Sequence, residues 1–153
     1  MSTPMMPKDR RSFSHLVNST YSRLYDDQPL NQRSGTLTIL SERLAFLRQA
    51  IQKIQQQIEA RQKLSEGFKQ QLGEEMAGFE QLLSEVKHSW RMGYNPSLDA
   101  RRNHLEKKLT DLRHELRMNH LNSWRDIVWL ERELREILEE YLSLVRILNS
   151  SSP

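Results

Sequence analysis

The sequence predicts an all-α protein: a long antiparallel coiled-coil helical hairpin, preceded by a short N-terminal amphipathic helix and completed into a bundle by oligomerisation. Two long stretches carry apolar residues at alternating spacings of three and four, which is the pattern of helices that pack through a narrow seam. A segment containing glycine, asparagine and proline separates the two stretches. Only 37% of the residues are apolar, so we expect a single module with a narrow apolar stripe rather than a thick core.

Residues 1–36 are expected to form a flexible arm, because prolines, serines and a glycine interrupt any long helix there. Within this arm a short run of apolar and aromatic residues follows helical spacing and predicts an amphipathic helix at about 12–26. Pro29 ends it, because the residue before a proline is disfavoured in the α conformation. The run consists of Phe13, Leu16, Val17, Thr20, Tyr21 and Leu24.

The first long helix of the hairpin is predicted over 37–90. Seven leucines and isoleucines from Leu37 to Ile58 define its seam, and the same heptad register continues through polar Arg61 and Ser65. The seam then reaches Val86 by the following positions: Phe68, Leu72, Glu75, Phe79 and Leu82.

A turn over 91–97 and a second long helix over 98–149 complete the hairpin of residues 37–149, with a tail at 150–153. Gly93 and Pro96 end one helix and start the next. The second seam contains an eleven-residue step from Leu116 to Ile127, a stutter that we expect to pass through His120 and Trp124. A turn near residue 94 places Ser65 across from Trp124.

One apolar surface is too wide for a two-helix hairpin to bury. Apolar residues on the second helix cover more than half of its circumference near the end that carries the termini, and the first helix adds Phe46. The short N-terminal helix, a second copy of the hairpin, or both together would cover this surface. The candidate oligomer or partner interface consists of Phe46, Val128, Trp129, Leu134, Leu138, Tyr141, Leu142 and Val145.

The other end of the hairpin combines cations with aromatic residues. Residues 87–118 contain eight lysines and arginines against four acidic residues. This tip suits either nucleic acid, through phosphate neutralisation and base stacking, or an acidic protein surface. Its mixed charges are also typical of a solvated helix face. The candidate contact surface consists of Trp90, Arg91, Met92, Tyr94, Arg101, Arg102, Lys107 and Lys108.

A polar layer is expected where the two seams lose their apolar character. Arg61 and Ser65 on the first helix face Asn119 and His120 on the second, and such layers fix register at some cost in stability. His114 and His120 are six residues apart, so they lack the i, i+4 spacing of a helical zinc site. With no cysteine and no nucleotide-binding or nucleophile motif, we expect no metal, cofactor or catalytic residue.

The sequence therefore favours a non-enzymatic structural or adaptor subunit that assembles with itself, with another helical protein, or with both. A nucleic-acid-binding helical protein that uses the tip is the alternative. The chain lacks a secretion signal and a run of about 18 apolar residues, so we expect it to be intracellular and cytoplasmic, with the nucleus as a second location.

Overall fold

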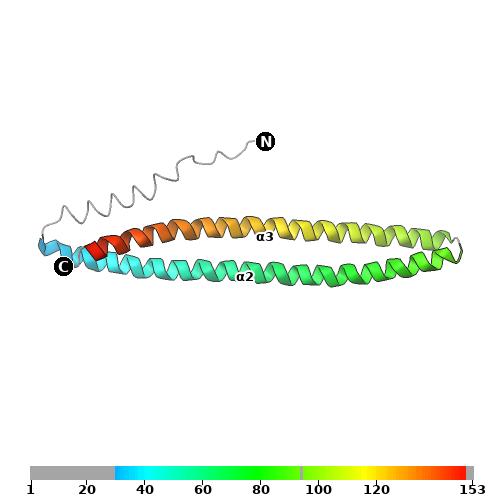
Figure 1. The fold of residues 1–153 in the computed structure, drawn as a ribbon, viewed down its shortest axis with the longest axis horizontal. Helices are drawn as coiled ribbons and strands as arrows, with labels where there is room; N and C mark the ends of the chain where they lie inside the picture. The colour runs from blue at the N-terminus through cyan, green and yellow to red at the C-terminus, as the bar shows by residue number, and fades with distance from the viewer. Residues whose placement is uncertain (1–29, 94, 151–153) are drawn as a thin grey trace, which may run out of the picture. The chain divides into compact units, whose positions relative to one another are not determined.

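A computed structural model describes residues 30–93 and 95–150, with side chains from residue 35 onward. Two long helices, α2 (Leu30–Arg91) and α3 (Pro96–Ser150), form the described part of the chain. They pack against each other as a hairpin, which confirms the predicted all-α class (Figure 1). The predicted N-terminal helix at 12–26 lies outside the described residues, as does Tyr94.

Helix α2 begins at Leu30, seven residues before the predicted start. It follows Pro29 directly, and the seven residues ahead of Leu37 include leucine, glutamine and arginine, which tolerate a helix well. Gly35 continues the helix and has nothing within 4 Å of the position that a Cβ would occupy. Gly35 lowers the helix propensity of this turn, but the helix continues through it.

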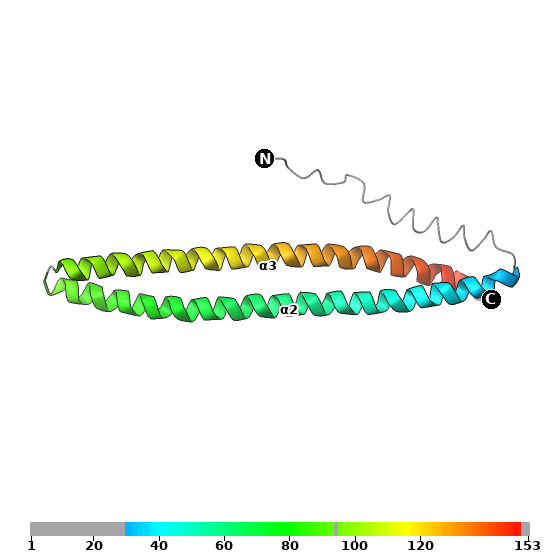
Figure 2. The ribbon, with the colours of Figure 1, turned by 180° about the vertical axis from the view of Figure 1, so that it is seen from behind.

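The connection between the helices is short and well capped. Gly93 has a φ of +158°, and its N–H donates to the carbonyl of Trp90 at 3.2 Å, closing the last turn of α2. Asn95 caps α3: its side-chain Oδ1 accepts a hydrogen bond from the Ser97 N–H at 2.9 Å. Pro96 then occupies the first helical position, where its missing N–H costs nothing. Figure 2 shows this connection joining the two helices.

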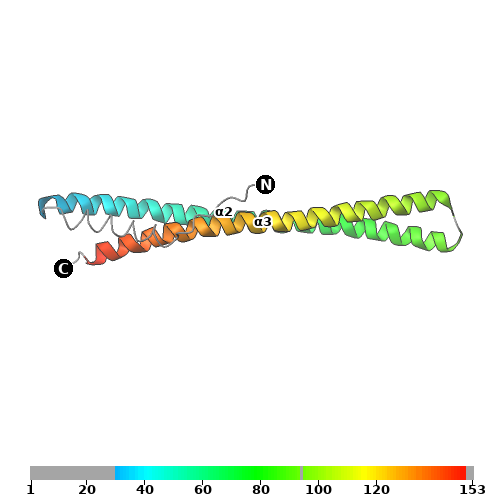
Figure 3. The ribbon, with the colours of Figure 1, turned by 90° about the horizontal axis from the view of Figure 1, so that it is seen from above.

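The residues fall into two compact units, and each helix contributes to both. The first unit comprises Met1–Gln57 with Leu130–Pro153, and the second comprises Ile58–Trp129. In the first unit the N-terminal part of α2 lies beside the C-terminal part of α3 (Figures 1 and 3). Its core is built on Leu40, Leu47 and Leu144, with Leu44, Ile137, Tyr141, Ile147 and Leu148 packed around them.

The second unit buries leucines and a valine from both helices. Contacts between Arg61 and Asp126 and between Glu80 and Arg113 show that the two helices run antiparallel here. The buried apolar residues of this unit are Leu72, Val86, Leu105, Leu109 and Leu112.

The seam of α2 shifts its position along this second unit. Phe68, Glu75 and Leu82, which the heptad register places in the seam, are exposed, while Met76 and Leu83 are half-buried instead. A strict seven-residue repeat moves by about 20° per heptad around an ideal helix, so the face turned toward α3 changes by one position. The prediction was therefore wrong for these three residues.

The seam of α3 passes through its stutter by a different route from the expected one. Ser123 is 6% exposed and Trp124 is 62% exposed, so the serine faces α2. Ser65 contacts Asn119 rather than Trp124. The eleven-residue step is bridged by Asn119, which is half-buried and bonded to Ser65, and by the buried Ser123.

Candidate interaction surfaces

A stripe of apolar residues lies on α3 of the first unit, away from α2. At 100° per residue, Leu138, Leu142 and Val145 are turned by about 100° to 160° from Leu144, which is fully buried against α2. Leu142 remains 51% exposed, and Leu138 and Val145 are half-buried. These three residues follow spacings of four and three, so they form a second apolar stripe on the same helix.

Two further residues of the predicted interface border this stripe. Leu134 and Tyr141 are half-buried between the stripe and the core of the first unit. The Arg48 Nε–H donates to the Tyr141 hydroxyl at 3.0 Å, and the guanidinium carbon lies 5.8 Å from the centre of the tyrosine ring. Arg48 therefore holds the ring in place and gives this edge of the stripe a polar rim.

Phe46 lies on another flank of the first unit, so it does not join the stripe. The Arg43 guanidinium lies 5.2 Å from the centre of its ring and makes two hydrogen bonds to the Glu140 carboxylate, at 2.9 and 3.1 Å. Phe46 also lines a pocket of about 370 Å³ together with Ile54 and Ile137. The bidentate arginine fixes this side of the unit, because both of its hydrogen bonds are charge-assisted.

The last two residues of the predicted interface, Val128 and Trp129, belong to the second unit. Val128 is half-buried and Trp129 is largely exposed. Within the first unit, the interface that the sequence predicts as one surface is therefore divided between the apolar stripe and the flank that carries Phe46.

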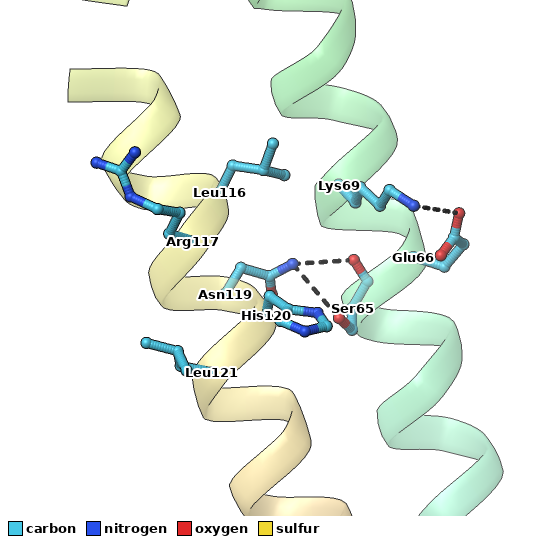
Figure 4. A pocket seen from close by; sticks show the side chains of 8 residues that line it. All are labelled: Ser65, Glu66, Lys69, Leu116, Arg117, Asn119, His120 and Leu121. Atoms are coloured by element: carbon cyan, nitrogen blue, oxygen red, sulfur yellow. Dashed lines mark hydrogen bonds and ion pairs between the residues drawn. The ribbon is translucent and has the colours of Figure 1, made fainter. Parts of the chain in front are cut away.

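Polar side chains meet between the helices in the second unit. The Asn119 amide donates to the Ser65 carbonyl at 3.2 Å and to the Ser65 hydroxyl at 3.3 Å (Figure 4). Nearby, the Arg61 Nε–H donates to the Asp126 carboxylate at 3.0 Å. Asp126 was not among the predicted residues. The available signal was its negative charge, opposite to that of Arg61, at a position one turn beyond Asn122 on α3.

His120 is exposed and lies beside the Asn119 and Ser65 pair in Figure 4. Both residues of that pair and His120 line a pocket of about 620 Å³. Its other lining residues are Glu66, Lys69, Leu116, Arg117 and Leu121. Lys69 and Glu66 approach to 3.9 Å, and this largely exposed ion pair contributes little to stability.

The predicted tip residues separate into different faces of the second unit. Arg102 lies over the Trp90 ring, with its guanidinium carbon 5.7 Å from the ring centre, and is held between Asp99 and Glu106 at 3.8 Å each. Met92 is strongly exposed beside the connection. Arg101, Lys107 and Lys108 are all exposed.

Arg91 of the predicted tip surface shares a groove near the connection with three other basic residues. Lys87, His88 and Arg91 from α2 and Arg113 from α3 line a pocket of about 490 Å³. Glu80 is the only acidic residue of this lining, and it lies 3.8 Å from Arg113. The sequence signal for this groove was the spacing of four between Lys87 and Arg91, but only the register between the helices adds Arg113.

No group of three or more histidine, cysteine, aspartate or glutamate side chains suited to a metal ion occurs in the described part of the chain. Over the same residues, no helix is long and apolar enough to cross a membrane.

The described residues define an all-α protein with two long helices packed as a hairpin. A family model described as a family of unknown function, DUF8104, matches residues 41–147. The chain belongs to this family. In the comparisons with curated proteins and with solved structures, nothing matches the chain.

Proposed function

We propose that this chain is a non-enzymatic structural or adaptor subunit that mediates protein–protein assembly through the apolar stripe of the first unit. The single observation that supports the proposal is the second stripe on α3, formed by Leu138, Leu142 and Val145. A helix that packs against one partner needs one stripe, and this helix has two. The second stripe suits another helix, as in a helical bundle.

A second copy of the chain is the partner that we propose. The stripe is made of leucine and valine, the same residue types that fill the seam between α2 and α3, so two such stripes can pack at the density of a protein core. A few such residues buried at the centre of an interface carry most of its binding energy.

The first experiment compares two exposed leucines. Leu142→Asp places a charge in the stripe, whereas Leu64→Asp places the same charge at a leucine of the second unit that is 67% exposed. Burying an unpaired carboxylate is costly, so we expect Leu142→Asp to reduce the assembled mass toward that of one 18.2 kDa chain. Leu64→Asp should leave the mass unchanged. Sedimentation velocity over a range of concentrations measures both.

Circular dichroism provides the folding control, because Leu142 is exposed and its replacement should leave the helical content of the single chain intact. A wild-type chain that sediments at 18.2 kDa at every concentration would contradict the proposal. Equal losses of mass in the two variants would also contradict it, because the effect would then not depend on the stripe.

A further inference from the structure

We infer that the basic groove of the second unit, formed by Lys87, Arg91 and Arg113, is a docking site for an acidic amphipathic helix. The argument depends on residues of 58–129 alone and is independent of the assembly proposed for the first unit. It starts from the groove of about 490 Å³ that these three residues line together with His88 and Glu80.

Two of the three cations of the groove have no ion pair among the described residues. Among the described residues, Arg113 has an ion pair with Glu80 at 3.8 Å, whereas no ion pair involves Lys87 or Arg91. Both side chains of the Glu80 and Arg113 pair are more than half exposed, so the pair is weak and can exchange partners. The groove therefore offers an excess of positive charge to a ligand.

The shape and floor of the groove favour a helix. It lies between two antiparallel helices, and its apolar lining comes from Leu83 and the buried Leu109. A third helix fits such a space, as helix-in-groove recognition generally requires an apolar anchor with charged flanks. Lys87 and Arg91 are four residues apart, so they can meet two carboxylates four residues apart on the partner, with about 5 to 6 Å between Cβ atoms on each helix.

The same features argue against a nucleic acid as the ligand. A partner helix can place a leucine over Leu83, its carboxylates over Lys87 and Arg91, and a neutral side chain beside Glu80, whereas each phosphate of a nucleic acid strand carries a charge that Glu80 repels. The other tip cations do not extend the groove into a continuous track. On α3, Arg101, Lys107 and Lys108 are turned by about 120° or more from Arg113. Arg102 is turned by only about 20° from Arg113, but it lies 3.8 Å from both Asp99 and Glu106, so its charge is already paired.

The test uses a labelled synthetic peptide of about 18 residues, long enough to form a helix, with leucines along one face and glutamates at i, i+4 beside them. Its counterpart carries glutamine at each glutamate, and a labelled single-stranded oligonucleotide is the third probe. Fluorescence anisotropy at low ionic strength measures the binding of each probe to the full chain.

We expect the acidic peptide to bind more tightly than its glutamine counterpart. The Lys87→Glu/Arg91→Glu/Arg113→Glu variant reverses the charge of the groove. It should weaken binding of the acidic peptide by about tenfold or more, because the charge pairs across the interface then become repulsive. The matched control, Arg101→Glu/Lys107→Glu/Lys108→Glu, changes the net charge equally and should alter the affinity by less than about twofold. Glu80→Gln should strengthen binding severalfold, since it frees Arg113.

Several results would overturn the inference. The inference is wrong if the acidic peptide binds no better than the glutamine peptide, or if the two triple variants lose affinity equally. It is also wrong if the oligonucleotide binds more tightly than the peptide and its binding depends on the same three cations. Circular dichroism verifies folding, and the neutral Lys87→Gln/Arg91→Gln variant repeats the comparison if the triple variant loses helicity.

Discussion

At the scale of single residues, Asn119 and Ser65 make a polar contact between the two helices of the second unit. The amide of Asn119 makes two hydrogen bonds, and one of them is to a backbone carbonyl that already belongs to α2. Replacing the asparagine would therefore leave no buried group of Ser65 without a partner, because its hydroxyl can bond to its own helix. The contact contributes to register more than to stability.

Asn119→Leu should consequently leave the free energy of unfolding unchanged or raise it by up to about 1 kcal/mol, because a half-buried amide gives way to an apolar side chain. Urea denaturation followed by circular dichroism measures this change, with Asn122→Leu, at an equally half-buried asparagine one turn further along α3, as the control. A loss of stability greater than about 1 kcal/mol would show that the two hydrogen bonds hold the unit together.

At the scale of the helices, residue spacing predicted most of the architecture but not the rotation of each seam. The clear heptads from Leu40 to Ile54 place the buried residues of α2 in the first unit correctly. Beyond Arg61 the apolar residues are sparse, so the spacing favoured a register with Phe68 and Leu82 in the seam and gave no reason to choose Leu83. The accumulated difference between 3.5 and 3.6 residues per turn then determines which of them faces α3, and this depends on packing between helices.

The neighbouring positions Ser123 and Trp124 test this rotation directly. Trp124→Ala should lower the free energy of unfolding by less than about 1 kcal/mol, because the indole is 62% exposed. Ser123→Phe should lower it by about 1 to 3 kcal/mol, since a large side chain cannot fit at a position that is 6% exposed. Thermal and urea unfolding measure both variants. A larger loss of stability for Trp124→Ala than for Ser123→Phe would show that Trp124 faces α2, as residue spacing indicated.

At the scale of the whole molecule, the sequence predicted which kinds of residue form the candidate surfaces, but not which of those residues lie on the same surface. The sequence identified the apolar excess of α3 and the cations near the turn, because both depend on residue type and spacing along one helix. It could not separate Phe46 from Leu142, or combine Lys87 with Arg113, because those relations depend on how two helices pair across a hairpin. An error of a few residues in that pairing changes which side chains share a surface.

The pairing itself can be measured, because the chain contains no cysteine and any introduced pair is free of competition. Ser65→Cys/Asn119→Cys should form an intramolecular disulfide on mild oxidation, since the two native side chains are in hydrogen-bond contact. Ser65→Cys/Trp124→Cys, the pairing expected from a turn centred near residue 94, should form it far more slowly, because Trp124 faces away from α2. Non-reducing electrophoresis of dilute protein separates the two cases. A disulfide that joins two chains in the first variant would instead mean that the helices pair between molecules, and the hairpin would then be an exchanged dimer.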